Sequence, residues 1–229
     1  MKGNQFSGTI ATNIKDLTQL VMLDLAENKL SGSIPTQIGS LRNSLNVLSL
    51  HTNKLNSTIP DEILSFEYLQ RLDLSSNDLT GTLPANETVS LQQLEYLYLD
   101  NNKLNGKIPE MLWKLDDLRS LALYNNNFTG TLSSNIASLN ELELLSFSHN
   151  SFSGNVPSEI GSLIRLKRLG IDSNRFTGMI SDEICRLPHL QHFLADCRGE
   201  VEVECECCTA CCAEDGKGCV VNDPSTSPD

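Results

Sequence analysis

Residues 94–109, LEYLYLDNNKLNGKIP, decide the fold because their pattern recurs along most of the 229-residue chain. The repeated unit places an Asn after the pattern L-x-x-L-x-L and before the pattern x-Leu/Phe-x-Gly. Phe147 and Ile171 replace the third Leu of their repeats, and Ser57 replaces one Gly. The Asn returns every 24 or 25 residues, at Asn4, Asn28, Asn53, Asn77, Asn102, Asn126, Asn150 and Asn174. Such a period indicates a repeat protein in which each copy is one structural unit.

The spacing within one copy predicts its local structure. Leu97 and Leu99 are two residues apart, so they share one face of a short strand. The Gly permits backbone conformations that other residues avoid. Apolar pairs three residues apart, such as Ile160 and Leu163, predict one helical or 3₁₀ turn on the convex side.

The Asn after each strand is predicted to be structural rather than ligand-binding. Its side chain carries donors and an acceptor, so it can bond the backbone of its own turn and of the neighbouring turn. We expect a ladder of Asn28, Asn53, Asn77, Asn102, Asn126, Asn150 and Asn174. Because no copy can bury its apolar stripe alone, the copies must stack. The sequence therefore predicts an α/β solenoid with a concave parallel sheet.

The pattern L-x-x-L-x-L-x-x-N-x-L-x-G-x-I-P resembles the plant-type leucine-rich repeat of receptor-like proteins and polygalacturonase-inhibiting proteins. The likeness covers residues 4 to about 198, with Ser133 and Ser181 in place of Pro and insertions near residues 43–44 and 86–90. It implies a right-handed superhelix in which L-x-G-x-I-P forms short second strands. It also implies perception, adhesion or inhibition of a secreted enzyme.

Four regions are expected along the chain. Residues 1–181 hold the repeats, and residues 182–198 read as a degenerate terminal repeat because Arg198 stands where the next Asn is due. Residues 199–220 are a Cys-rich cap and residues 221–229 a disordered tail. Because residues 4–10 resemble the second half of a repeat, Phe6, Ile10, Ile14 and Leu17 are expected to face water. We expect a chain truncated at its N-terminus.

The cysteines are confined to the C-terminal part, at Cys185, Cys197, Cys205, Cys207, Cys208, Cys211, Cys212 and Cys219. An even number in a short stretch favours a disulfide cap, although 105 pairings are open. A thiolate metal site at Cys208-x-x-Cys211 and a free or redox-active thiol pair are the alternatives. The run ADCRGEVEVECECCTACC is also similar to the tails of secreted, diatom-type algal leucine-rich repeat proteins, a likeness that implies no activity. The disulfide cap favours an extracellular or cell-surface location.

Composition excludes several classes of protein. The chain has 29 acidic and 17 basic residues without a basic run, which argues against binding nucleic acid. It contains no window of 18 apolar residues that could span a bilayer.

The chain also has three N-x-[ST] glycosylation triplets, which begin at Asn56, Asn86 and Asn127. They are expected in or near the loops after strands and not on the concave strand face.

Catalysis is not predicted, because the chain has no phosphate-binding loop, nucleophile elbow or zincin motif. No cofactor and no metal are expected. Instead, the outward residues of adjacent strands predict one amphipathic ligand-binding patch, in which Arg71 lies beside the ring of Tyr96. The carboxylates in it are expected to be solvated surface charges. The patch comprises Arg71, Asp73, Tyr96, Tyr98, Asp100 and Tyr124.

These features predict a non-catalytic, extracellular recognition module that binds a protein, peptide or glycan on its concave face. Two alternatives remain open. One is a secreted structural or surface-coat protein that binds ions, polysaccharide or ice. The other is an intracellular scaffold whose Cys tail binds zinc. The ligand, the biological process and the oligomeric state are not determined by the sequence.

Overall fold

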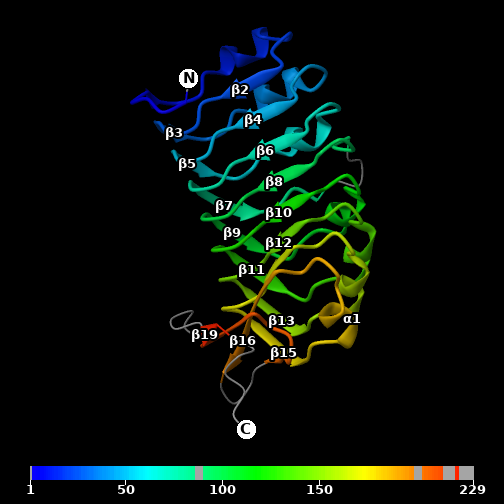
Figure 1. The fold of residues 1–229 in the computed structure, drawn as a ribbon. Coiled ribbons are helices and arrows are strands. Elements are labelled where there is room, and N and C mark those ends of the chain that lie inside the picture. The colour runs from blue at the N-terminus through cyan, green and yellow to red at the C-terminus, as the bar shows by residue number, and fades with distance from the viewer. Residues whose placement is uncertain (1, 86–89, 199–202, 214–219, 222–229) are drawn as a thin grey trace.

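A computed structural model of the protein describes residues 2–85, 90–198, 203–213 and 220–221. The chain winds through stacked copies of one strand–turn–strand unit, which form an elongated solenoid (Figure 1). The sequence-based prediction of an α/β solenoid is confirmed.

The first strands of the repeats build a parallel sheet, which we call the concave sheet. Each strand pairs in register with the strand of the next repeat, as Leu72 does with Leu97 and Leu97 with Leu121. The strands of the repeats are β2 (Met22–Asp24), β4 (Val47–Ser49), β6 (Arg71–Asp73), β8 (Tyr96–Tyr98), β10 (Ser120–Ala122), β12 (Leu144–Ser146), β14 (Arg168–Gly170) and β16 (His192–Arg198). The tail adds β18 (Ala210–Ala213) and, antiparallel to it, β19 (Val220–Val221).

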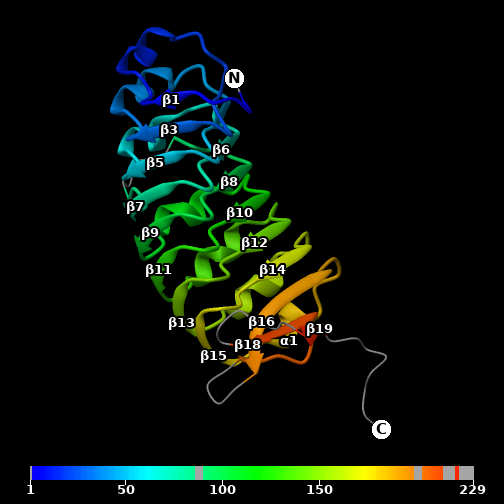
Figure 2. The ribbon, with the colours of Figure 1, turned by 90° about the vertical axis from the view of Figure 1, so that its left-hand side faces the viewer.

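The L-x-G halves of the repeats build a second parallel sheet on an adjacent side of the solenoid (Figure 2). Its strands are β1 (Ser7–Gly8), β3 (Lys29–Gly32), β5 (Lys54–Ser57), β7 (Asp78–Thr82), β9 (Lys103–Gly106), β11 (Asn127–Gly130), β13 (Ser151–Asn155), β15 (Arg175–Met179) and β17 (Val203–Glu204). The repeat Gly residues have positive φ, as at Gly81 with 79°, and Ser57 adopts the same conformation with 78°. This explains why Gly occupies the position in the other repeats.

Short helical turns carry the chain back from the second sheet to the concave sheet. They are η1 (Thr12–Asp16), η2 (Thr36–Leu41), η3 (Asp61–Ser65), η4 (Glu110–Lys114), η5 (Ser134–Ser138), η6 (Ser158–Ser162) and α1 (Asp182–Cys185). Ile38, Ile136 and Ile160 of these turns are fully buried. The turns therefore close the third side of the core.

The core is one continuous cluster of repeat Leu and Ile residues that runs the length of the solenoid. In the C-terminal half, Phe replaces Leu after the ladder Asn. The rings of Phe128, Phe152 and Phe176 stack with centroids 6.2 and 6.1 Å apart. Successive repeats are thus joined by direct packing of identical positions.

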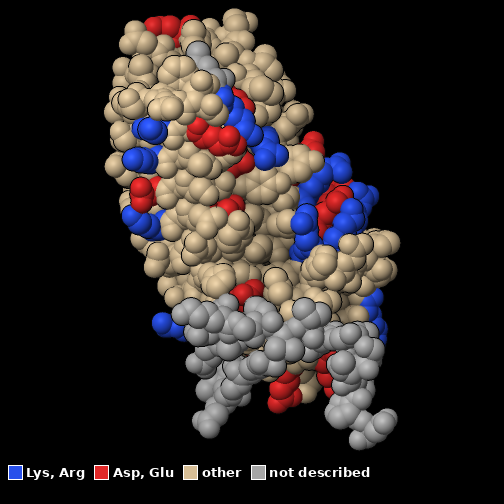
Figure 3. All heavy atoms as spheres, turned by 60° about the vertical axis from the view of Figure 1, so that its left-hand side comes forward, with Lys and Arg blue, Asp and Glu red and all other residues tan. Residues whose placement is uncertain are grey.

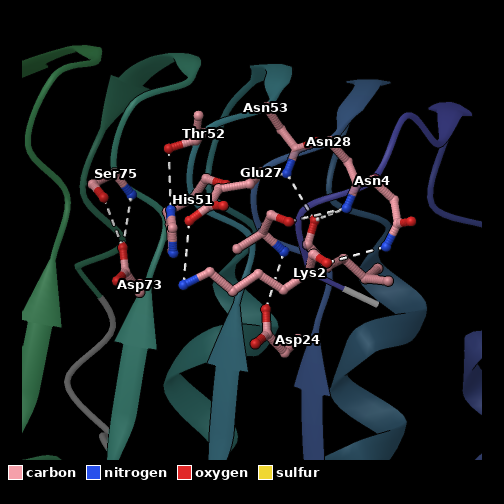
Figure 4. A network of polar contacts seen from close by, with 12 residues as sticks. Lys2, Asn4, Asp24, Glu27, Asn28, His51, Thr52, Asn53, Asp73 and Ser75 are labelled. Atoms are coloured by element: carbon pink, nitrogen blue, oxygen red, sulfur yellow. Dashed lines mark hydrogen bonds and ion pairs between the residues drawn. The ribbon is translucent and has the colours of Figure 1, made fainter.

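The ladder Asn side chains bond the backbone of two repeats. Asn102 Nδ2 donates to the carbonyl oxygens of Leu74 and Leu99, each at 3.0 Å, and its Oδ1 accepts from the N–H of Leu79 at 3.0 Å. Asn28 makes equivalent bonds at the N-terminal end, within the polar network of Figure 4. Each Asn satisfies backbone groups that the strand-to-turn transition would otherwise leave unpaired.

The Cys-rich tail continues both sheets instead of covering them as a separate layer. β17 pairs in parallel with β15, and β18 pairs in parallel with β16, while β19 turns back antiparallel to β18. The described tail therefore adds strands beyond the terminal repeat. Residues 199–202, 214–219 and 222–229, which include much of the expected cap and tail, lie outside the described residues.

Disulfides join this tail to the last repeat. Cys185 pairs with Cys207 and Cys197 with Cys211 across this boundary, whereas Cys205 pairs with Cys208 within the tail, and Cys212 is also disulfide-bonded. Cys208 and Cys211, the suggested metal-ligand pair, thus belong to different disulfides, and a disulfide sulfur is not the thiolate that binds a metal. Cys219 lies outside the described residues.

The N-terminal edge differs in part from expectation. Phe6 and Leu17 are 49% and 51% exposed, as the half-repeat suggested, but Ile10 is buried and Ile14 is partly buried. The prediction for Ile10 was wrong, because its side chain packs onto the core of the following repeats. No helix in the described part of the chain is long and apolar enough to cross a bilayer.

Two of the predicted glycosylation triplets lie off the concave sheet, as expected, but on strands. Asn56 lies within β5 and Asn127 begins β11, so both are exposed on strands of the second sheet rather than in loops. The prediction that these two lie off the concave strand face is therefore confirmed, but they lie in short strands and not in loops. Asn86 lies outside the described residues.

Candidate binding surface on the concave sheet

The predicted patch brings Arg71, Tyr96 and Tyr98 together on β6 and β8. The guanidinium carbon of Arg71 lies 4.8 Å from the ring centroid of Tyr98 and 5.7 Å from that of Tyr96. The two rings are 6.4 Å apart and tilted by 30°. Tyr96 is the direct strand partner of Arg71, yet the guanidinium lies closer to Tyr98 because it also reaches Asp73.

The two carboxylates of the patch are buried, contrary to the expectation of solvated charges. Asp73 and Asp100 are only 5% and 6% exposed. Asp73 Oδ2 accepts from Arg71 Nη2 at 3.1 Å, and its Oδ1 accepts from the hydroxyl of Ser75 at 2.7 Å (Figure 4 shows the latter). The prediction was wrong because hydrogen-bond donors from the same strand, from the turn that follows it and from the neighbouring repeat cover these short side chains and replace water.

Within the patch, Asp100 holds Tyr124 through a hydrogen bond. Burial raises the pKa of the Asp100 carboxyl, against the opposing effect of hydrogen bonds from Tyr124 and Asn101. The pKa of the Tyr124 hydroxyl is also raised, first by burial and then by the nearby Asp100 charge. Tyr124 is therefore positioned by Asp100, while its ring stays half-exposed.

A hollow of about 330 Å³ lies next to this patch, towards the C-terminal end of the sheet. Only three of its lining residues, Tyr98, Asp100 and Tyr124, belong to the patch predicted from the sequence. The others were missed because most are small or apolar and lack chemical signatures of their own. They are Ala122, Leu144, Leu145, Ser146, Arg168, Leu169, Gly170, His192 and Leu194.

Charged side chains on this side of the molecule are mostly paired. Figure 3 shows Lys and Arg beside Asp and Glu in several clusters, with uncharged surface between them. Ion pairs cross from repeat to repeat between Arg119 and Glu95 at 3.1 Å and between Lys167 and Glu143 at 2.7 Å. Among the described residues, no three His, Cys, Asp or Glu side chains are grouped so that they could hold a metal ion.

A family model described as Leucine Rich Repeat matches residues 19–41, 68–86, 93–115, 117–139 and 141–163. These five segments match leucine-rich repeats. These matches cover the strands and turns that carry Arg71, Tyr98, Tyr124 and Leu144. The predicted patch therefore lies within the matched repeats, while the hollow extends beyond the last match to Arg168 and His192.

Known proteins with similar repeats include plant receptors. The chain is 43% identical over 53 residues to Receptor-like protein 46 of Arabidopsis thaliana. This matched segment covers 23% of this chain and 6% of that protein. The plant peptide hormone receptor RGFR1, solved in complex with RGF2, matches with a TM-score of 0.76 and 31% identity over 90% of this chain and 31% of that chain. The leucine-rich repeats here thus span only a small part of these receptors.

A plant ice-binding protein has a similar structure. Its match has a TM-score of 0.72 and 28% identity, and covers 84% of this chain and 61% of that chain. The same repeat architecture therefore occurs in proteins whose described ligands differ greatly.

Proposed function

We propose that this chain is an extracellular, non-catalytic recognition module that binds a protein or peptide on its concave sheet. The observation that carries the proposal is the cluster of Arg71, Tyr96 and Tyr98, whose half-exposed rings and guanidinium face solvent on adjacent strands. Aromatic rings and Arg are the side chains that most often dominate binding energy at protein interfaces.

The similar receptor supports a protein or peptide ligand in particular, since RGFR1 was solved with RGF2 bound. An extracellular location is supported by the disulfides of the tail, because disulfides persist in oxidising compartments. The same disulfides argue against the alternative of an intracellular scaffold with a zinc-binding tail. A glycan remains a further ligand class that the same aromatic surface could bind.

Substitution of the rings tests this proposal. Partners captured from extracellular extracts by the immobilised protein would be identified, and their affinities compared for wild type and Tyr98→Ala. We expect a loss of about 2 kcal/mol or more in binding free energy, as for a central aromatic anchor.

Met22→Ala is the matched control, because Met22 is exposed on the first strand of the same sheet, far from the rings. Its effect should stay below about 1 kcal/mol. A partner that still binds after loss of both Tyr96 and Tyr98, but is lost on changing the convex turns or the tail, would overturn the choice of face.

Binding to ice is a second candidate function, favoured by a specific feature of the second sheet. Short hydroxyl and amide side chains point outward on both sides of the repeat Gly, in rows that follow the strand spacing of about 4.8 Å. The methyl groups of Thr58 and Thr82 lie against Gly81 and Gly106, where an added Cβ would come within 2.7 Å. The exposed rows include Ser7, Asn56, Thr80, Asn105, Thr129, Thr9, Ser33, Thr58, Thr82 and Thr131.

Ice recrystallisation assays test this second function separately. If the second sheet binds ice, Thr82→Lys combined with Thr131→Lys should abolish the inhibition of crystal growth, because two bulky cations break the rows. Thr18→Lys, on an exposed turn away from this sheet, is the control. Absence of any inhibition by the wild-type protein would remove this candidate and leave the concave-face proposal untouched.

A further inference from the structure

The hollow on the concave sheet is produced by a large–small–large series of side chains in one row. Strand pairing places Tyr98, Ala122, Ser146, Gly170 and Leu194 side by side on β8, β10, β12, β14 and β16. The three central residues are small. Because adjacent strands are about 4.8 Å apart, the flanking large residues stand roughly 19 Å from each other, with the hollow between them.

Gly170 deepens the floor at its centre. A Cβ at this position would lie 2.6 Å from the hydroxyl oxygen of Ser148, which itself donates to Asp172 Oδ1 at 2.5 Å. Any larger residue would therefore displace a bonded, buried side chain. The floor is fixed by backbone and by short side chains held in place.

The two ends of the hollow differ chemically. At one end stand the rings of Tyr98 and Tyr124, the latter held by Asp100. At the other end stand Arg168 and His192, three and four strands from Tyr98, which are direct strand partners of each other. Leu144 lies beside Arg168 on the neighbouring strand and adds apolar surface.

Arg168 differs in its ion pairing from Arg71, the arginine of the predicted patch on the same sheet. Arg71 is paired with Asp73 at 3.1 Å. Arg168 is exposed and has no ion-pair partner among the described residues. An Arg guanidinium carries five donors whose planar geometry suits a carboxylate.

From these observations we infer that the hollow is a subsite for a peptide segment that presents an apolar or aromatic side chain close to a carboxylate. The apolar group lies over Ala122, Ser146 and Gly170 against the tyrosine end, and the carboxylate meets Arg168 and His192. A volume of about 330 Å³ is at the small end of ligand sites and suits one side chain with its flanking backbone. This subsite rests on the concave-face function proposed above and extends it beyond the Arg71–Tyr98 cluster.

The carboxylate can come from a chain terminus or from an acidic side chain, and short peptides distinguish these sources. The probes are N-acetyl-Gly-Gly-Phe with a free terminal carboxylate, the same peptide as its C-terminal amide, and N-acetyl-Gly-Phe-Gly-Asp amide. Binding is measured by NMR titration of the full chain. We expect at least one of the two carboxylate peptides to bind tenfold or more tightly than the uncharged amide.

Two variants assign that binding to the hollow. Ser146→Phe fills the floor and should abolish binding of all three peptides, whereas Val47→Phe enlarges a concave-sheet residue outside the hollow and should not. Arg168→Gln should lower the affinity for the carboxylate peptides to the affinity for the amide peptide. Arg175→Gln removes another exposed cation, on the second sheet, and is its control.

Equal affinity of the protein for the carboxylate peptides and the amide peptide would overturn the proposed subsite. Peptide binding that survives Ser146→Phe would overturn it as well. The concave-face function would still stand if its captured partner is lost on changing Tyr96 and Tyr98. Conversely, a captured partner that is indifferent to every concave-sheet variant overturns the function itself, whatever the peptides show.

Discussion

The middle of the solenoid and its C-terminal end stabilise the same turn with different groups. At Asn126 and Asn150 the turn N–H groups donate to backbone carbonyls of the next repeat, those of His149 and Ser173. In the last regular turn, the N–H groups of Ser173 and Asn174 instead donate to the two carboxylate oxygens of Asp196, at 2.7 and 3.0 Å.

The comparison shows what a repeat loses when the regular pattern stops. A mid-solenoid repeat has an identical neighbour on each side that supplies acceptors in register. At the end, a side chain and covalent links take over. Burial raises the pKa of Asp196, despite the two backbone N–H groups that favour its charged form. The last turn therefore depends on particular residues rather than on the repeat.

The largest effect is expected from breaking the disulfides of the end. In the chain-entropy description, the loss grows with the length of the closed loop. The double variant Cys197→Ser/Cys211→Ser opens a link of separation 14 between β16 and β18 and should cost about 3 kcal/mol of unfolding free energy.

Cys205→Ser/Cys208→Ser opens a link of separation 3 and is the matched comparison, with a smaller expected loss. Urea unfolding gives both values, and hydrogen exchange should show β16 opening before β8. Equal protection of β16 in wild type and in the Cys197/Cys211 variant would contradict a structural role for this link.

The next effect concerns the middle of the solenoid. Asn102→Ala leaves the carbonyls of Leu74 and Leu99 and the N–H of Leu79 without their partner in a buried site. We expect a loss of about 1–3 kcal/mol in unfolding free energy. Asn105→Ala, an exposed Asn in the same repeat, serves as the control. A loss of only a few tenths of a kcal/mol at Asn102 would show that the ladder is dispensable.

A smaller, stabilising effect is expected where one repeat departs from the others. Ser57 has a φ of 78° in place of the usual Gly. Since the left-handed region costs an L-residue roughly 1–2 kcal/mol, Ser57→Gly should raise the unfolding free energy by about 1 kcal/mol. Ser31→Gly, at a neighbouring strand position without positive φ, should lower it instead. Thermal unfolding of both variants measures the contrast.

The smallest effect is a pH dependence at the buried carboxyls. Because the pKa of Asp100 is raised by folding, the folded state holds its proton more tightly than the unfolded chain. The resulting stability is present at low pH and is lost as pH rises through the raised pKa. Asp100→Asn should flatten this decline above about pH 4, measured by urea midpoints. Asp116→Asn, at an exposed site, should leave the profile unchanged; a steeper decline in Asp100→Asn would refute the sign.

The regular part of the molecule could be predicted because its signals repeat. One Leu or one Asn would have been ambiguous, but eight copies at a fixed period assign the strand, the ladder and the positive-φ Gly together. The candidate site was predicted only in part. The pattern identified Tyr96 and Tyr98 as outward residues, yet it gave no means of seeing that Asp73 and Asp100 fold beneath their neighbours and become buried.

The sequence by itself determined the repeat, the parallel stacking and the side of the sheet on which each residue lies, because these depend on spacing alone. Only the tertiary structure decided which cysteines pair, that Asp196 takes over from the backbone in the last turn, and that Ala122, Ser146 and Gly170 line a hollow. These features arise between residues from different repeats or from the irregular tail. Their side chains meet only once the chain has stacked, so no local pattern encodes them.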